Sequence, residues 1–349
     1  MQSEQQFNCW YGNMIVVFGA EGFIGTYLVS QLINGGYSVT AVGLDELGEA
    51  YYDRQRIPFV RVDITEEKEF SKLPQKGVSC VVNLACLQPA NVKKENYNPA
   101  NYIKVNTIGT LNILEYCRKT GAGKVIYTIS HRSVQGLWEQ GKVITENDIK
   151  CIKYTGNFSM YSISEGAAMD CVEHYSQQYG LQGIILRLPP VYGYGPHMEG
   201  FRDGKPEKTG FQVFIDKAIS GETIELWGNC DKGRDIIYVK DVLSAIILGL
   251  KSDTASGLYN IASGKALSLK EEAEAIIKAF SPVDHPSQII LRPDKQNSID
   301  PFVYDISKAR RDLKWYPRFS IAEMLEDYKK EMKSGRFNFL IEKRKRMMV

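Results

Sequence analysis

The chain has 349 residues, of which 44% are hydrophobic and 24% charged, and its formal net charge is +2. This balance is ordinary for a globular protein and lacks the basic excess that favours nucleic acid as a partner. Seven cysteines without a CxxC pair, and four histidines, argue against a metal site and for reduced thiols in a cytoplasmic protein.

Residues 1–13 are polar and lack the apolar core of a signal peptide. No later apolar run approaches the length of a membrane span, so we expect no membrane as a partner. Short β-rich runs then alternate with amphipathic segments over the first half of the chain. The expected strands are 14–19, 37–43, 78–85, 124–130 and 183–188.

Three segments between these strands repeat apolar residues at helical spacing. The first runs from Ile24 through Leu28 to Leu32, the second covers 108–117, and the third covers 164–179. This alternation of strand and helix predicts an α/β fold, a Rossmann-like doubly wound parallel sheet with helices on both faces.

A glycine-rich turn, FGAEGFIG, joins the first strand to the first helix. Gly19, Gly22 and Gly25 carry no Cβ, so the backbone can turn tightly and approach a pyrophosphate at the positive end of the helix. Glycines also serve close strand–helix packing, but their place between strand and helix near the N-terminus favours dinucleotide binding.

An acid is expected at the end of the second strand, where it would hold the hydroxyls of the adenosine ribose. Gly43 occupies that position, and Asp45 follows two residues later. No arginine lies between Asp45 and Arg54, so a 2′-phosphate lacks an obvious partner. We expect Asp45 to reach the ribose and the cofactor to be NAD, with NADP as the alternative.

The pattern changes after the fifth strand. Residues 189–210 are rich in proline, glycine and charge, which predicts a long loop. Two S-x-x-E capping boxes, Ser268 with Glu271 and Ser320 with Glu323, each open an amphipathic helix. These features predict a smaller C-terminal α/β lobe. The final run, FNFLIEKRKRMMV, is expected to be a solvated tail or helix end.

A tyrosine and an acid stand one helical turn apart in SMYSISEGAAMD. Glu165 follows Tyr161 by four positions and shares its helix face. A phenol titrates near pH 10, so a tyrosine that exchanges protons at neutral pH usually needs a nearby cation. A carboxylate acts in the opposite sense, and the tyrosinate form is therefore disfavoured here.

Further motifs occur in a fixed order along the chain. They are RVDIT (61–65), VVNLA (81–85), VNTIGTLNILEYC (105–117), LRLPPVYG (186–193), GRDIIYVKDV (233–242), YNIASG (259–264) and DISKARRDLKW (305–315). Together with the glycine-rich turn, this series resembles the extended short-chain dehydrogenase/reductase family, specifically its NAD-dependent nucleotide-sugar epimerases, dehydratases and reductases.

The resemblance implies two domains and a nucleoside-diphosphate sugar as the substrate. An NAD(P)-binding Rossmann domain would comprise 1–188 and a returning segment at about 236–262. A nucleotide-sugar-binding lobe would comprise 189–235 and 263–349. Members of the family often form homodimers through two helices per subunit, which match segments 106–119 and 161–179.

The motifs assign residues to each ligand. The expected cofactor-binding residues are Gly19, Gly22, Phe23, Ile24, Gly25, Asp45, Asp63, Ile64, Leu84, Ala85, Asn106, Tyr161 and Glu165. Among them, the resemblance places Asp63 and Ile64 at the adenine and Ala85 near the nicotinamide. The expected substrate-binding residues are Ser133, Pro190, Arg234 and Arg292, and the guanidinium of Arg234 suits the substrate pyrophosphate.

The expected catalytic positions depart from the family pattern. Members use a Ser or Thr with the Tyr and Lys of Y-x-x-x-K, and the lysine lowers the pKa of the tyrosine. Tyr161 matches the tyrosine, but Glu165 stands at the lysine position. His131 stands at the Ser/Thr position, with Ser130 just before it, and Pro190 replaces an asparagine that contacts substrate in the family.

Three interpretations follow. In the first, Tyr161 is a neutral phenol and His131 supplies or takes the proton, which suits a 4-keto-sugar reductase; Glu165 could also pair with an imidazolium His131 and hold it charged. In the second, the protein is an epimerase whose acid/base residues lie on 189–210, where His197 is available. In the third, it binds a dinucleotide or sugar nucleotide without turnover, as a regulatory or scaffold subunit. We favour an enzyme.

Overall fold

The computed structural model describes residues 14–342, apart from residues 94, 95, 139, 157, 198, 203, 204 and 298. The polar N-terminal segment and the basic end of the chain, residues 1–13 and 343–349, lie outside the described residues.

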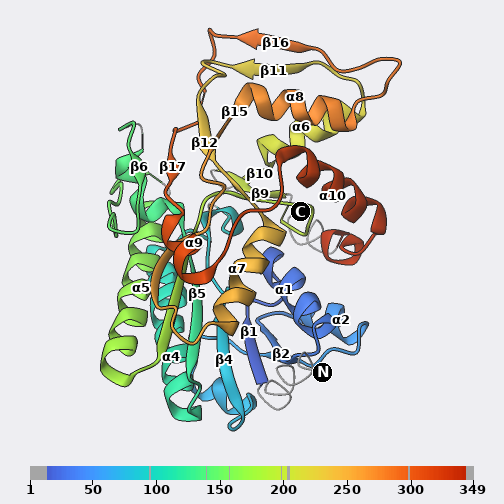
Figure 1. Ribbon diagram of the computed structural model, residues 1–349. Helices are drawn as coiled ribbons and strands as arrows, with labels where there is room; N and C mark the ends of the chain where they lie inside the picture. Colours follow the sequence, from blue (N-terminus) through green and yellow to red (C-terminus); the bar gives the residue numbers. More distant parts are fainter. Residues whose placement is uncertain are drawn as a thin grey trace, which may run out of the picture.

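A seven-stranded parallel sheet forms the centre of the larger lobe (Figure 1), with the order β14-β7-β5-β4-β1-β2-β3. Its strands are β1 (Met14–Phe18), β2 (Ser38–Gly43), β3 (Phe59–Arg61), β4 (Val78–Asn83), β5 (Lys124–Ser130), β7 (Gln182–Leu188) and β14 (Gly257–Asn260). All five strands expected from the sequence are present, and β3 and β14 are additional. The chain adds strands to one side of β1 and then, from β4 onward, to the other.

Helices cover both faces of this sheet because successive side chains of a strand point to opposite faces. Val17 and Ile126 belong to the core under α1 and α7, whereas Val16 and Val125 belong to the core under α4 and α5. The bounds are α1 (Phe23–Asn34), α4 (Gly109–Thr120), α5 (Ser159–Tyr179) and α7 (Val239–Lys251). No helix in the described part of the chain is both long and apolar enough to span a bilayer.

A smaller α/β lobe follows in the sequence and lies at the top of Figure 1. It contains α6 (Gly210–Ile219), β11 (Ile224–Trp227), β12 (Gly233–Asp235), β15 (Ala266–Ser268), α8 (Leu269–Phe280), β16 (Ile289–Arg292) and α10 (Ile321–Ser334). Both predicted capping boxes are confirmed. Ser268 Oγ accepts from the backbone of Glu271, whose carboxylate accepts from Ser268 N at 2.9 Å, and Ser320 and Glu323 repeat the arrangement.

Residues 189–210 are more ordered than the predicted long loop. They contain the short strand β8 (Val191–Tyr192) and an antiparallel hairpin of β9 (Glu199–Arg202) and β10 (Lys205–Lys208). The hairpin lies against η2, a short 3-10 helix at Pro89–Asn91. The proline and glycine content of this segment could not distinguish a hairpin from an irregular loop, because both contain turn residues.

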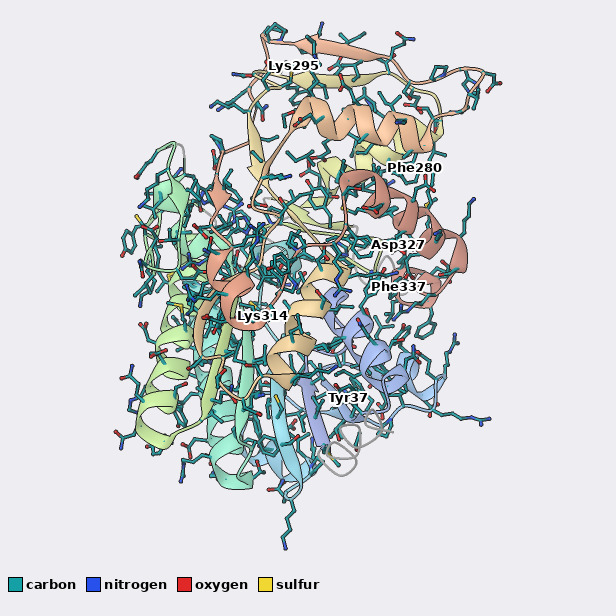
Figure 2. All side chains as sticks on the ribbon, viewed as in Figure 1. Tyr37, Phe280, Lys295, Lys314, Asp327 and Phe337 are labelled. Atoms are coloured by element: carbon teal, nitrogen blue, oxygen red, sulfur yellow. The ribbon has the colours of Figure 1, made fainter. Side chains whose placement is uncertain are left out.

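Residues 338–342 are helical and the apolar part of the C-terminal run is buried, so of the expected solvated tail or helix end, the solvated tail is wrong there. Phe337 and Leu340 have no exposed surface, and the ring of Phe337 lies 5.1 Å from that of Tyr27 on α1 (Figure 2). Arg336 donates to the carbonyl of Thr26 at 3.0 Å. These contacts attach residues 336–337 to the helix that follows the glycine-rich turn.

Candidate active site

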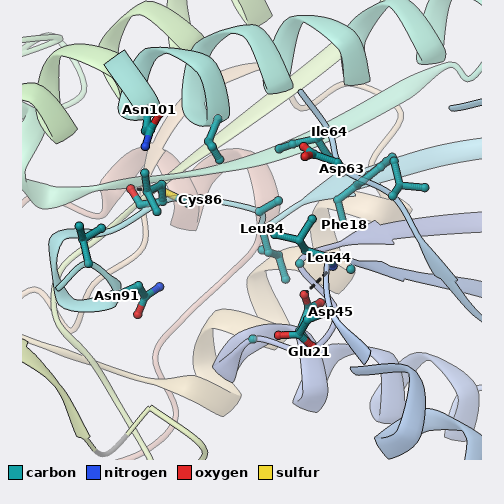
Figure 3. A pocket seen from close by; sticks show the side chains of 18 of the residues that line it. Phe18, Glu21, Leu44, Asp45, Asp63, Ile64, Leu84, Cys86, Asn91 and Asn101 are labelled. Carbon is teal, nitrogen blue, oxygen red and sulfur yellow. Dashed lines mark hydrogen bonds between the residues drawn. The ribbon is translucent and has the colours of Figure 1, made fainter. Parts of the chain in front are cut away.

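A crevice of about 660 Å³ lies at the carboxyl ends of β1, β2 and β4 (Figure 3). Strands β1 and β4 are the neighbours at which the strand order reverses, and parallel sheets bind their ligands at such a point. The crevice is lined by the glycine-rich turn, by the ends of the three strands, and by residues between Leu84 and Val105.

Part of the predicted cofactor set lines this crevice. The predicted residues found there are Gly19, Gly22, Asp45, Asp63, Ile64, Leu84 and Ala85. The predicted residues that do not line it are Phe23, Ile24, Gly25, Asn106, Tyr161 and Glu165. The lining residues that the sequence did not predict include Glu21, Leu44, Cys86 and Leu87.

The glycine-rich turn has the close backbone approaches expected of a phosphate cradle. Gly19 has φ +73°, and a Cβ there would lie 2.7 Å from backbone atoms of Leu84 and Ala85. A Cβ on Gly25 would lie 2.2 Å from the Gly19 carbonyl oxygen, so Gly25 serves strand–helix packing. Gly22 is the N-cap of α1, whose first turn contains no acidic side chain. The positive helix end is thus left to an anion, which fits a dinucleotide pyrophosphate.

Two acids lie at the end of β2. Asp45 is the N-cap of α2 (Glu46–Asp53), and its Oδ1 accepts from Gly48 N at 3.0 Å. Glu21 reaches across from the glycine-rich turn, and its Oε1 accepts from Leu44 N at 2.9 Å (Figure 3). Asp45 therefore lies at the crevice as expected, but one of its oxygens is already engaged in capping a helix.

Asn106 is hydrogen bonded to the backbone of Leu87, one of the residues that line the crevice. Its Oδ1 accepts from Leu87 N at 2.7 Å, and its Nδ2 donates to Leu87 O at 3.1 Å and to Ser164 Oγ at 2.9 Å. The side chain is buried and does not line the crevice. Asn106 therefore acts on the crevice only through the position of Leu87.

Tyr161 and Glu165 form a buried, hydrogen-bonded pair next to the crevice. They are 6% and 2% exposed, and the Tyr161 hydroxyl is hydrogen bonded to the Glu165 carboxylate. That carboxylate also accepts from Ser130 N at 3.3 Å and from the Cys86 thiol at 3.6 Å. Cys86 lines the crevice, so one residue links the pair to the predicted cofactor space. The Ser130 hydroxyl is hydrogen bonded to Tyr161 as well.

Burial controls the protonation of this pair. It raises the pKa of Glu165 to about 8, against the smaller opposing effect of hydrogen bonds from Tyr161, Ser130 and Cys86. Burial, and then the charge of Glu165, raises the pKa of Tyr161 well above its ordinary value. At neutral pH the pair therefore holds protons, and the tyrosinate form is excluded.

His131 lies in an aromatic stack. Its ring centroid is 5.2 Å from that of Trp138 and 5.5 Å from that of Phe302, and its Nδ1 lies 3.2 Å from Leu188 O. Burial, followed by the charges of Arg132 and Arg234, lowers the pKa of His131 well below its ordinary value. The neutral ring contradicts the expectation that Glu165 holds His131 as an imidazolium.

Arg234, on β12, is the predicted pyrophosphate ligand and is held by a polar cluster. It is hydrogen bonded to Tyr192, whose hydroxyl donates to Glu272 at 3.1 Å. Burial opposes its charge, but Tyr192, Glu272 and Asp300 outweigh that effect, and the pKa of Arg234 is raised. The guanidinium is therefore a fixed cation.

Arg132 is a second, half-buried cation that the sequence did not predict. Its guanidinium lies 3.5 Å above the ring of Phe158 and donates to Gln135 at 3.1 Å. Burial lowers the pKa of Arg132 to about 10, so it stays charged at neutral pH, and it is electrostatically coupled to Tyr161 and Arg234. Arg132 is a single arginine between a histidine and a serine, and this local sequence matches no motif that would predict its role.

The other three predicted substrate-binding residues each have different neighbours. The buried hydroxyl of Ser133 has no hydrogen-bond partner among the described residues. The carbonyl of Pro190 accepts from Ile237 N at 3.1 Å. Arg292 lies on the two-stranded β11–β16 sheet, 3.8 Å from a carboxylate oxygen of Glu225, with 43% of its side chain exposed.

The structure brings His197 to the glycine-rich turn. Its ring stacks on Phe23 with centroids 3.6 Å apart. Phe23 is the first residue of α1, so the segment after β8 covers the start of that helix.

Residues 15–262 match the NAD dependent epimerase/dehydratase family. UDP-glucuronic acid decarboxylase 6 of Arabidopsis thaliana is 28% identical over 333 residues, which cover 90% of this chain and 88% of that protein. UDP-glucose 4-epimerase of Mycolicibacterium smegmatis is 26% identical over 315 residues, which cover 88% of this chain and 95% of that protein. The crystal structure of a Thermotoga maritima UDP-glucose 4-epimerase with UDP-glucose superimposes with a TM-score of 0.75 at 24% identity, covering 92% of this chain and 99% of that one. This structural likeness confirms the predicted fold.

Proposed function

We propose, because this chain belongs to the NAD-dependent epimerase/dehydratase family, that it reduces a 4-keto group on a nucleoside-diphosphate sugar. Bound NADH would supply the hydride. The chain's own residues would bind the two ligands, keep water away and deliver the proton. On the same resemblance we propose a two-domain organisation and a homodimer formed through segments 106–119 and 161–179.

The crevice residues fit the cofactor by their chemistry. The glycine-rich turn offers backbone amides and an uncompensated helix end to the pyrophosphate. Asp63 and Ile64 lie in the same crevice and are assigned to the adenine, and Leu84 and Ala85 continue the wall toward Cys86. Ala85 and Cys86 would then lie on the nicotinamide side.

The buried pair of Tyr161 and Glu165 is the observation that carries the reductive direction. A carboxyl group with a pKa of about 8 keeps its proton in about nine molecules of ten at pH 7. A protonated Glu165 can donate to the Tyr161 oxygen while Tyr161 donates its own proton to the carbonyl oxygen of the sugar. The proton lost by Tyr161 is thus replaced by that of Glu165, and no tyrosinate forms. Reduction needs such an acid, whereas oxidation of a sugar hydroxyl needs a base.

The two arginines support the choice of a diphosphate substrate. Arg234 and Arg132 are half-buried and charged at neutral pH, and the charge of Arg234 lowers the pKa of Arg132. Two like charges held together in this way are stabilised by a dianion between them, and guanidinium groups suit phosphate oxygens.

A second function is favoured by one feature of the pair. The Tyr161 hydroxyl is bonded inward to Glu165, and Cys86 rather than Tyr161 lines the crevice. A protein that binds NAD and a sugar nucleotide without turnover, as a regulatory or scaffold subunit, is compatible with this arrangement.

The test mixes the purified full chain with NADH or NADPH and a panel of UDP-, GDP-, CDP- and dTDP-4-keto sugars. Oxidation of the reduced nicotinamide is followed by absorbance. We expect turnover with at least one sugar, and a loss of roughly a hundredfold or more in Tyr161→Phe. Tyr154→Phe is the matched control, because Tyr154 is 76% exposed. Ligand binding without turnover across the panel supports the second function, and failure to bind either ligand overturns both.

A further inference from the structure

Glu21 occupies the space that an acid at the end of β2 would need. Gly43 is the last residue of β2 and carries no side chain. A Cβ built on Gly43 would lie 2.0 Å from a carboxylate oxygen of Glu21. A side chain at Gly43 and the present position of Glu21 are therefore mutually exclusive, and the carboxylate comes from the glycine-rich turn instead.

The carboxylate of Glu21 is held in place from two sides. Leu44 N donates to its Oε1 at 2.9 Å (Figure 3), and a Cβ on Gly48 would lie 2.9 Å from the Cβ of Glu21. The turn just before Glu21 is tied to α2, because the buried Tyr52 hydroxyl donates to Ala20 O at 2.6 Å. The first turn of α2 thus packs on the stem of Glu21 and fixes its direction.

The neighbouring acid has a different role. Asp45 accepts from Gly48 N as the N-cap of α2. Moving it toward a ligand would expose that helix end, which typically costs about 1 kcal/mol in other proteins. Glu21 makes its backbone contact without such a capping role, and it lines the same crevice as Gly19, Gly22 and Asp63.

We infer that Glu21, rather than an acid on β2 or Asp45, accepts the hydroxyls of the adenosine ribose and sets a preference for NAD over NADP. A carboxylate accepts hydrogen bonds from vicinal hydroxyls but repels a 2′-phosphate. Among the described lining residues the one cation is Lys93, and none is the arginine that typically accommodates a 2′-phosphate. The inference rests on the proposed function only in that the crevice binds a nicotinamide dinucleotide.

The test measures NAD and NADP binding to the full chain by isothermal titration calorimetry. Glu21→Gln keeps the size and the acceptor for Leu44 N but removes the charge. We expect the Kd for NAD to rise roughly tenfold and the Kd for NADP to fall, so that the preference for NAD is lost. Glu46→Gln is the matched control, because Glu46 is a nearby acid on α2 with 84% of its side chain exposed.

A relocation variant separates ligand binding from local folding. The double variant Glu21→Ala/Gly43→Asp moves the carboxylate onto β2 and removes the side chain that Gly43→Asp alone would strike. We expect it to regain the preference for NAD that Glu21→Ala loses, with the thermal unfolding of each variant checked alongside. If the wild-type chain binds neither dinucleotide, the proposed function fails and this inference with it. If the wild type binds NAD and Glu21→Gln leaves both affinities unchanged, the inference alone is overturned.

Discussion

Glu165 changes the chemistry open to Tyr161 because both side chains are buried in one hydrogen-bonded pair. A cation at this position would favour the tyrosinate form, whereas Glu165 raises the pKa of the phenol further. Burial also makes Glu165 a proton donor at neutral pH, since its pKa is about 8. With Glu165 in place of a cation, the site contains a protonated carboxyl group that can donate a proton, and it lacks a tyrosinate that could accept one.

The raised pKa of Glu165 predicts a pH-dependent stability. The folded state favours the protonated carboxyl, so this contribution is fully present below the ordinary pKa of 4.5 and is lost as pH rises through about 8. We expect Glu165→Gln to gain stability relative to wild type across this window, by roughly 1.4 kcal/mol per pH unit. Urea unfolding at several pH values measures the difference.

The control for that series is Glu274→Gln, because Glu274 is exposed on α8. If the stability difference between Glu165→Gln and wild type changes with pH no more than that of the control, the Glu165 carboxyl is not buried in its neutral form.

Some site residues could be predicted from local sequence patterns, and others could not. Glycine spacing located Gly19, Gly22 and Gly25, and helical spacing placed Glu165 on the face of Tyr161. The Glu21–Leu44 bond joins residues 23 positions apart, and no local pattern announces it. The neutral state of His131 depends on its neighbour Arg132 and also on Phe302 and Arg234, which only the fold brings to it.

At the scale of elements, the order of strands places the crevice. Long apolar strands such as β5 were predictable because burial on both faces leaves an unbroken β-rich run. β3 and β14 were missed because each has only three or four residues and lies at an edge of the sheet. The hairpin β9–β10 was missed because its backbone pairing, rather than an apolar pattern, defines it.

The two capping boxes make a prediction about helix stability. Ser268→Ala should destabilise the protein by about 1 kcal/mol, because the first turn of α8 loses its side-chain acceptor. Ser320→Ala should do the same for α10. Chemical unfolding measures both, with Glu274→Ala in the middle of α8 as the control. Losses no larger than that of the control would show that these caps contribute nothing.

At the scale of the whole molecule, the segment after α10 packs on the first helix of the described residues. Arg336 and Thr26 are 310 residues apart in sequence, and Phe337 packs on Tyr27 of the first helix. Asp327 on α10, labelled in Figure 2, accepts from Lys240 at 2.8 Å and from Tyr238 at the start of α7. In the sequence, a short apolar run beside a basic cluster looks like a solvated tail. The surface that buries it belongs to α1, which is too far away in the sequence for any local pattern to indicate it.

Phe337→Ala tests this packing. Removing a fully buried aromatic ring should cost about 3–5 kcal/mol of folding free energy. Val283→Ala is the control, because Val283 is 100% exposed and should change stability by less than about 0.5 kcal/mol. Equal unfolding midpoints for the two variants would show that the C-terminal run is not docked.

The pH dependence of kcat/KM for carbonyl reduction, compared between wild type and Glu165→Gln, tests the central claim most directly. If Tyr161 and Glu165 act as one proton-donating pair, wild-type kcat/KM falls as pH rises through about 8, and this fall is absent from Glu165→Gln. A variant that keeps the same fall, or a wild-type rate that increases through that pH, would contradict the account.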